Sequence, residues 1–243
     1  MKKALSILTA GCLAVSLAAC GSTAASSAAS AADSTASSAA ESTAATDTAA
    51  ADGQTYKVGI CQLVQHVALD AATQGFKDAL TEQLGDAVTF EEKNAQGDSN
   101  TCSTIINGFV SDNVDLILAN ATPALQAAQA GTNTIPVLGT SVTEYGVALG
   151  IDDFDGLVGT NISGTSDLAP LDEQAGIIKE LFPDAKTVGL LYCSAEPNSQ
   201  YQVDTVKASL EELGYTCEYY AFSDSNDLAT VCQSAADASD VIY

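Results

Sequence analysis

The sequence alternates short apolar segments with amphipathic ones, and this alternation restricts the fold more than any other feature. Tyr56, Val58 and Ile60 belong to an apolar segment that is typical of a buried strand. The segment after it predicts a helix, because its apolar residues recur at near-helical spacing: Leu69, Ala72, Phe76, Leu80 and Leu84. A polar turn with Gln62, His66 and Asp70 separates the two. We therefore expect a strand, a turn and a helix at 56–84.

The same alternation continues to the last residue. Strands are expected at about 87–92, 114–119, 135–138, 187–192 and 216–222, with an apolar start at 240–243. Helices are expected at about 99–110, 199–213 and 225–236. Two more are expected, one that follows Thr122 as its N-cap and one that Pro170 opens. Ser199 and Gln202 have capping-box spacing, and 139–150 is less regular. This order predicts an α/β fold with parallel sheets.

The second half of the chain repeats the pattern of the first. Val58-Gly59-Ile60 matches Val188-Gly189-Leu190, and 114–117 matches 239–242, while the strand at Val88 matches the one at Cys217. The repeat predicts two Rossmann-like lobes, at 54–160 and 170–243, joined by a hinge crossing at 161–169. Because the chain ends inside the third strand of the second lobe, we expect that lobe to be truncated at the C-terminus.

The first 53 residues differ in composition from the rest. Residues 1–19 have a basic start followed by an apolar stretch, which predicts a signal peptide. Leu17-Ala18-Ala19-Cys20 resembles the lipobox of bacterial lipoproteins, in which the cysteine is acylated; the alternative is a secreted protein with an incidental cysteine. Residues 20–53 are almost entirely Ala, Ser, Thr and Asp, and are expected to form a disordered tether from a lipidated Cys20. The protein is thus expected outside the cytoplasm, anchored to the cell membrane by lipid.

The charge balance limits the possible partners. The formal net charge is −23, and all eight cationic residues are lysines, so the chain contains no arginine. Nucleic acid is therefore not expected as a partner, because phosphate binding requires clustered Lys or Arg. The bidentate arginine clamp for a carboxylate is also missing. An anionic ligand group would have to be held by backbone N–H groups, hydroxyls, amides or a lysine.

Signatures of catalysis and of metal binding are weak. His66 is the one histidine, and the chain has no HExxH motif, nucleophile elbow or P-loop. The interpretation is therefore a protein that is not an enzyme, with no cofactor and no metal. Five cysteines lie beyond residue 53, without CxxC spacing, and small buried side chains are the default for them. Cys61 and Cys193 lie near the ends of matching strands, which allows them to face each other across a cleft.

Candidate ligand-binding residues lie where strands end and helices begin, since helix N-termini present unpaired N–H groups there. In the first lobe they are Gln62, His66, Asp70, Ala121, Thr122, Ser141 and Thr143. The crossing contributes Thr165, Ser166 and Asp167, and the second lobe Asn198 and Ser199. Several have a structural alternative: His66 at the helix start, Asp70 as a dipole partner of its own helix, and Thr122, Asn198 and Ser199 as caps. For 161–167 the alternative to a ligand wall is a hinge.

These residues, taken together, resemble one family of lipoproteins. The opening segment 58–76, DLILANATPALQAA at 115–128, IPVLGTSVTEYG at 135–146, NISGTSD at 161–167 and NSQYQV at 198–203 are similar to substrate-binding proteins of ABC transporters. Glu144-Tyr145 departs from the usual acidic residue followed by proline. The resemblance implies the type I periplasmic-binding fold and a ligand held between two lobes. It further implies delivery to a permease and ATPase complex, and some members are assigned to aromatic amino acids.

The expected function is therefore capture of a small solute by a monomeric lipoprotein of an ABC importer. An amino acid, with aromatic ones included, is the expected solute, because an acidic chain favours a ligand with an ammonium group. A ligand-sensing surface lipoprotein with the same fold is the alternative, and an enzyme comes after it.

Overall fold

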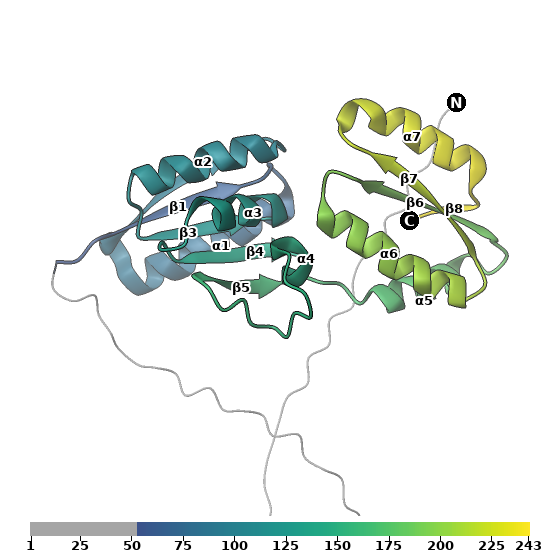
Figure 1. Cartoon of the computed structure of the whole chain (residues 1–243), viewed down its shortest axis with the longest axis horizontal. Helices are drawn as coiled ribbons and strands as arrows, with labels where there is room; N and C mark the ends of the chain where they lie inside the picture. The colour runs from purple at the N-terminus through teal and green to yellow at the C-terminus, as the bar shows by residue number, and fades with distance from the viewer. Residues whose placement is uncertain (1–52) are drawn as a thin grey trace, which may run out of the picture. The chain divides into compact units, whose positions relative to one another are not determined.

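The structure is a computed structural model, and it describes residues 53–243 (Figure 1). The expected signal peptide, Cys20 and nearly all of the expected tether lie outside the described residues. Within residues 53–243 no helix is both long enough and apolar enough to cross a membrane. Strands and helices alternate along this whole segment, as the sequence pattern predicts.

The first sheet contains five parallel strands in the order β2-β1-β3-β4-β5. The strands are β1 (Tyr56–Gln62), β2 (Val88–Asn94), β3 (Leu116–Asn120), β4 (Val137–Val142) and β5 (Ile162–Ser166). The helices between them are α1 (Val67–Leu84), a 3₁₀ turn (Gly85–Ala87), α2 (Ser99–Ser111), α3 (Thr122–Gly131) and α4 (Tyr145–Leu149). Parallel strands need such crossovers, since each must return to the same end of the sheet.

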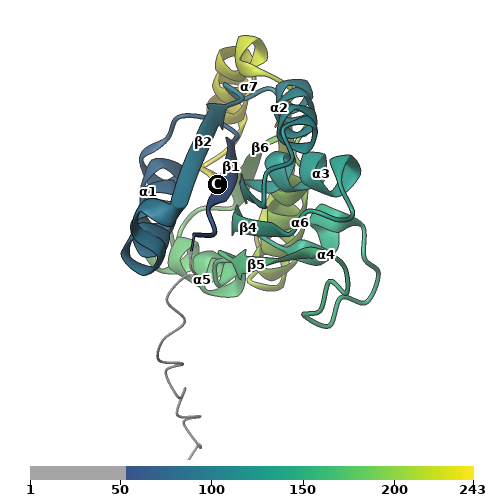
Figure 2. The same ribbon diagram turned by 90° about the vertical axis from the view of Figure 1, so that its left-hand side faces the viewer.

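Both faces of this sheet are covered by helices, α1 on one face and α2 with α3 on the other (Figure 2). Val58 and Ile60 point toward α1, where Phe76, Leu80 and Leu84 pack against them as the spacing predicts. Cys61 points to the opposite face and belongs to a larger core that holds the buried residues of α2 and α3. This alternation follows from the two-residue period of a strand.

The second sheet has three parallel strands in the order β7-β6-β8. The strands are β6 (Thr187–Cys193), β7 (Thr216–Phe222) and β8 (Val241–Ile242), and the helices are α5 (Leu171–Leu181), α6 (Pro197–Glu212) and α7 (Ser225–Ala238). A separate core holds Leu171, Ala175 and Ile178 of α5 with Val203, Val206 and Leu210 of α6.

The internal repeat is visible in strand register. Val58 pairs with Leu116 in the first sheet, and Val188 pairs with Val241 in the second. The sequence match equates Val58 with Val188 and Leu116 with Val241, so equivalent residues pair in both sheets. Asp115 and Asp240, which the match equates, have the same role in the two sheets. The Asp115 carboxylate accepts a hydrogen bond from Lys57 N at 2.7 Å, and Asp240 accepts from Lys186 N and Thr187 N at 2.8 and 3.0 Å. Each joins its own strand to the first strand of its sheet.

Several element boundaries differ from the expected ones. β4 continues to Val142, and the segment expected to be irregular includes α4, whose N-terminus is capped by the Glu144 carboxylate. Residues 162–166 of the expected crossing form β5, paired with β4. The division into lobes at 160 and 170 remains a prediction.

Two predicted helix caps are wrong. Thr122 is the first residue of α3 rather than its cap, and the cap position belongs to Ala121. The capping box at Ser199 and Gln202 is wrong as well, because α6 begins earlier, at Pro197, with Glu196 at the cap. Proline at the first helical position favours this earlier start, since its fixed φ suits a helix and its missing N–H is not needed there.

Candidate functional site

The order of strands reverses in each sheet around its first strand. The chain passes from β1 to β2 on one side and then to β3 on the other; β6, β7 and β8 repeat this arrangement. In open parallel sheets a ligand binds at the carboxyl ends of the strands that flank such a reversal. Gln62 and Asn120 are the last residues of β1 and β3 and are paired in register, so they lie at this point of the first sheet.

A buried network of polar side chains lies at this edge. Gln62 is 3% exposed, and its amide nitrogen donates to an Asp70 carboxylate oxygen at 2.6 Å and to Val64 O at 2.9 Å. Its amide oxygen accepts from the Thr73 hydroxyl at 2.7 Å. Asn120 Nδ2 donates to Leu69 O at 2.8 Å and to Thr73 Oγ1 at 2.9 Å. The network therefore fixes the first turns of α1 against β1 and β3.

The structure brings Gln62 and Asp70 together but leaves them unequally accessible. Both amide hydrogens of Gln62 are used inside the protein, which favours a positioning role for this side chain. Asp70 is exposed and lies in the first turn of α1. His66, also exposed, is the cap of α1, and its Nδ1 accepts a hydrogen bond from Ala68 N at 3.3 Å. His66 therefore has the structural role at the helix start that was its alternative to ligand contact.

The backbone at the start of α3 has an unusual conformation. Ala121 has φ 91° and ψ 157°, a region that is nearly restricted to glycine and costs about 1–3 kcal/mol. No side chain caps α3, so the N–H groups of Thr122 and Ala124 lack a side-chain acceptor at the carboxyl edge of the sheet. Free N–H groups and the positive end of the helix dipole can hold a carboxylate.

The predicted residues of the next strands lie along the same edge. Ser141 lies within β4 with a positive φ of 54°, and Thr143 follows that strand. The Ser166 hydroxyl donates to Thr143 O at 2.7 Å, and Asp167 N donates to Val142 O at 3.0 Å. The carboxyl ends of β4 and β5 are thus tied together.

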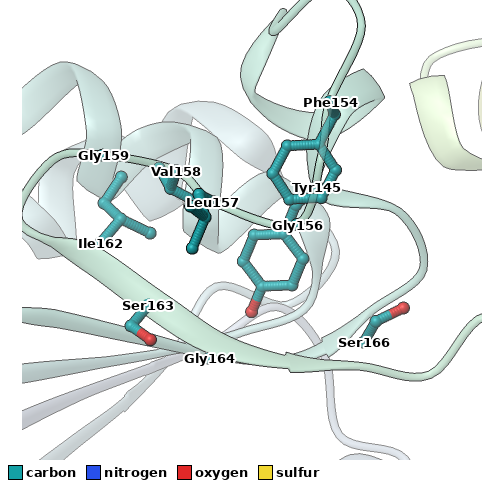
Figure 3. A pocket seen from close by; sticks show the side chains of 10 residues that line it. All are labelled: Tyr145, Phe154, Gly156, Leu157, Val158, Gly159, Ile162, Ser163, Gly164 and Ser166. Carbon is teal, nitrogen blue, oxygen red and sulfur yellow. The ribbon is translucent and has the colours of Figure 1, made fainter.

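A hollow of about 340 Å³ lies between β5 and the 150–161 segment (Figure 3). The rings of Tyr145 and Phe154 are stacked in it, with centroids 6.5 Å apart. The Tyr145 hydroxyl points toward the strand at Gly164 and donates to Thr165 O at 3.4 Å. Burial and, to a smaller extent, the Asp167 carboxylate raise the pKa of Tyr145 to about 12. This phenol therefore stays neutral at every physiological pH.

A second hollow, of about 500 Å³, lies at the carboxyl ends of the strands of the second sheet. It is lined by Leu191, Tyr192, Cys193, Glu196, Ser199, Gln202, Val203, Phe222, Leu228 and Tyr243. Three of these are aromatic, and Glu196 is the one carboxylate among them. Of the two residues predicted here, Ser199 lines the hollow, and Asn198 does not. The Asn198 amide oxygen is buried without a hydrogen-bond partner in the described chain.

Glu196 was missed by sequence reasoning, as were Thr73 and Asn120. The Glu196 carboxylate does not cap its own helix; it accepts a hydrogen bond from the Ser199 hydroxyl at 3.3 Å. Its place directly before Pro197 was the available signal, because proline marks the first helical residue. Asn120 was detectable as the polar end of the apolar run 116–119, whereas nothing in the sequence distinguishes Thr73 from a surface residue of α1.

Other site chemistry has little support in residues 53–243. No group of three or more His, Cys, Asp or Glu side chains in this part of the chain could hold a metal ion. Cys61 is buried in the core that also holds Cys102, so it does not face a cleft, and the possible approach to Cys193 is wrong.

Comparison with known proteins identifies the family. Residues 57–243 match the model of the family described as ABC transporter substrate binding protein. The chain therefore belongs to this family, and its two parallel sheets are those of the type I periplasmic-binding fold.

Three relatives illustrate the similarity. The tyrosine-binding protein of Clostridioides difficile (strain R20291) is 37% identical over 189 residues, which cover 76% of this chain and 54% of that protein. A conserved domain protein from Vibrio cholerae has a crystal structure with a TM-score of 0.73 and 34% identity, covering 78% of this chain and 65% of that one. The ABC domain from Streptococcus pneumoniae in complex with L-Trp has a TM-score of 0.73 and 33% identity, with coverages of 78% and 64%.

The chain is shorter than these relatives. It spans about half the length of the curated relative and about two thirds of the two solved structures.

Proposed function

We propose that this protein captures an amino acid for an ABC importer, with tyrosine and tryptophan as the first candidates. The observation that carries this proposal is the paired arrangement of the two sheets: both reverse their strand order, and both place polar groups at the carboxyl ends beside the reversal. The names of two relatives, a tyrosine-binding protein and a domain in complex with L-Trp, support the choice of ligand.

The chemistry of the two edges suits the two charges of an amino acid. The uncapped N-terminus of α3 offers N–H groups to a carboxylate, which matters in a chain without arginine. Glu196 offers a carboxylate to an ammonium group, and Tyr192, Phe222 and Tyr243 beside it offer apolar contact to a side chain. In the proposed complex, the first lobe holds the carboxylate of the ligand and the second holds its ammonium group.

The predicted ligand-binding residues form part of this proposal. Ala121, Thr122, Ser141 and Thr143 would border the carboxylate, with Thr165, Ser166 and Asp167 beside them. Ser199 would orient Glu196, and Asn198 would follow it in the first turn of α6. Gln62 would hold Asp70 and α1 in place, with His66 at the wall of the site.

The protein would act outside the cytoplasm, held to the cell membrane by a lipid on Cys20, as a monomer that delivers its ligand to a permease and ATPase complex. Binding would shift the population of the two lobes toward a closed form by the difference in ligand affinity between the two forms.

Thermal unfolding in the presence of candidate solutes tests the proposal. L-tyrosine and L-tryptophan should raise the melting temperature in a concentration-dependent way, because a ligand that binds only the native state stabilises it. Sugars and nucleosides at the same concentrations should leave it unchanged. A panel of all common amino acids that produced no shift would contradict the proposal.

A further inference from the structure

Two cysteines of the first lobe lie in the core between β1 and α2. Cys61 is the last residue but one of β1, and Cys102 lies in the first turns of α2. Both side chains are 0% exposed and belong to the same apolar cluster. Cys61 lies among the buried residues of β1, and Cys102 lies on the buried face of α2, so the two thiols enter the same core.

The packing of β1 against α2 brings the two cysteines close together. A Cβ atom on Gly59 would lie 2.7 Å from the Phe109 ring, so the α2-facing side of β1 meets the C-terminal part of α2 at Gly59. Cys61 is the next residue on that side of the strand. Cys102, Ile106 and Phe109 are the buried residues of α2 and share one helix face. Because strand and helix run in opposite directions, one step from Gly59 toward the carboxyl end leads from Phe109 toward Cys102.

We propose that Cys61 and Cys102 form a redox-sensitive pair that closes into a disulfide, joining the carboxyl end of β1 to the first turns of α2. This inference is independent of the proposed function. The three other cysteines in residues 53–243 are differently placed. Cys193 contacts a backbone oxygen, Ser223 O, at 3.9 Å; Cys217 is buried in the second core; and Cys232 is exposed.

The reaction requires a disulfide oxidant, for which glutathione disulfide is sufficient. Interaction with the Cys61 thiol lowers the pKa of Cys102, while the same interaction and burial raise the pKa of Cys61, so the Cys102 thiolate attacks first. Its sulfur bonds to one glutathione sulfur and releases the other glutathione as a thiolate. Cys61 then loses its proton and attacks the Cys102 sulfur of the mixed disulfide, which releases the second glutathione. The protein loses two electrons and two protons, and one glutathione disulfide becomes two glutathione molecules.

Burial determines when the pair can react. Because neither thiol is exposed in the native state, the oxidant reaches them before the core closes, during folding, or when α2 opens locally. Refolding in a mixture of reduced and oxidised glutathione is therefore the suitable condition.

The test is to refold the reduced protein in that mixture, block free thiols with N-ethylmaleimide and map the cysteines by mass spectrometry. Cys61 and Cys102 should be unmodified and recovered as one cross-linked peptide pair. The oxidised protein should melt roughly 5–10 °C above the reduced protein, since the disulfide restricts the unfolded chain.

Cys102→Ala should abolish this difference in melting temperature, whereas the matched control Cys217→Ala, which removes a buried thiol from the other core, should retain it. Alkylation of both Cys61 and Cys102, or a cross-link from either one to another cysteine, would overturn the inference. The mapping uses the unmodified sequence, so the result stands even where a variant folds poorly.

Discussion

At the scale of single residues, the amide of Asn120 joins α1 to β3 at the first edge. It is 0% exposed and holds both Leu69 O and Thr73 of α1. Its own oxygen accepts no hydrogen bond in the described part of the chain. The residue therefore anchors α1 to β3 at the cost of one unsatisfied acceptor.

Asn120→Ala should lower the free energy of unfolding by about 1–3 kcal/mol, because it leaves buried groups of α1 without their donor. Urea unfolding monitored by circular dichroism measures the change. Asn100→Ala, at an exposed position of α2, is the control and should have an effect of less than about 0.5 kcal/mol. Equal losses in the two variants would show that Asn120 does not anchor α1.

Tyr145 predicts a dependence of stability on alkaline pH. Its pKa of about 12 in the folded protein lies above the ordinary 10.0, so the folded state binds the phenolic proton more tightly than the unfolded state does. The resulting stabilisation is fully present below pH 10 and is lost as the pH rises to 12. It amounts to at most about 2–3 kcal/mol.

The difference in unfolding free energy between the wild type and Tyr145→Phe isolates this contribution. The difference should be constant up to pH 9 and then move in favour of the variant as the pH rises toward 12. A difference that stayed constant over the whole range would show that the hydroxyl titrates normally.

At the scale of elements, the start of α3 combines backbone strain with an uncapped N-terminus. Ala121 holds a conformation that suits glycine, and the helix behind it has no side-chain cap. Strain of this kind gathers at functional sites, where the surrounding structure maintains it.

Ala121→Gly should stabilise the protein by about 1 kcal/mol, because relief of the strain exceeds the added entropy of the unfolded chain. Ala130→Gly, at an exposed position of α3, provides the contrast and should destabilise by about 1 kcal/mol. Chemical unfolding of both variants measures these changes in the free energy of unfolding. A loss of stability in Ala121→Gly would show that the backbone of Ala121 is not strained.

The elements also show how far sequence reasoning extends. Apolar patterns together with capping and proline signals predicted the strands and helices of the two sheets except α4 and β5. The repeat matched segments that have equivalent pairing in the two sheets, β1 with β3 and β6 with β8. β5 was missed because 162–166 is polar and lies at the sheet edge, where strands need few apolar residues. α4 was missed because a helix of five residues has no visible period.

The candidate site was less accessible from sequence than the fold. The positions of Gln62, Thr122 and Ser199 at strand ends and helix starts follow from the pattern. The direction in which a side chain points does not follow from the pattern. Gln62 points inward and bonds to Thr73 and Asp70, and Glu196 does not cap its own helix. Such choices depend on packing between segments that are far apart in the sequence.

At the scale of the whole molecule, the proposal divides one ligand between two sheets. The carboxylate is assigned to the N-terminus of α3 and the ammonium group to Glu196. A net charge of −23 and the absence of arginine are consistent with this division, since the chain attracts the positive end of a zwitterion without a side-chain clamp for the negative end.

Isothermal titration calorimetry with L-tyrosine, on the wild type and on Glu196→Gln, tests this claim most directly. Glu212→Gln, at the exposed end of α6, is the matched control. The account predicts binding of L-tyrosine at one site, an affinity lower by about tenfold or more in Glu196→Gln as expected for loss of a charged partner, and no change in Glu212→Gln. Tyrosine binding of equal strength in all three proteins would contradict the assignment of the ammonium group, and the absence of binding to the wild type would contradict the choice of tyrosine as the ligand.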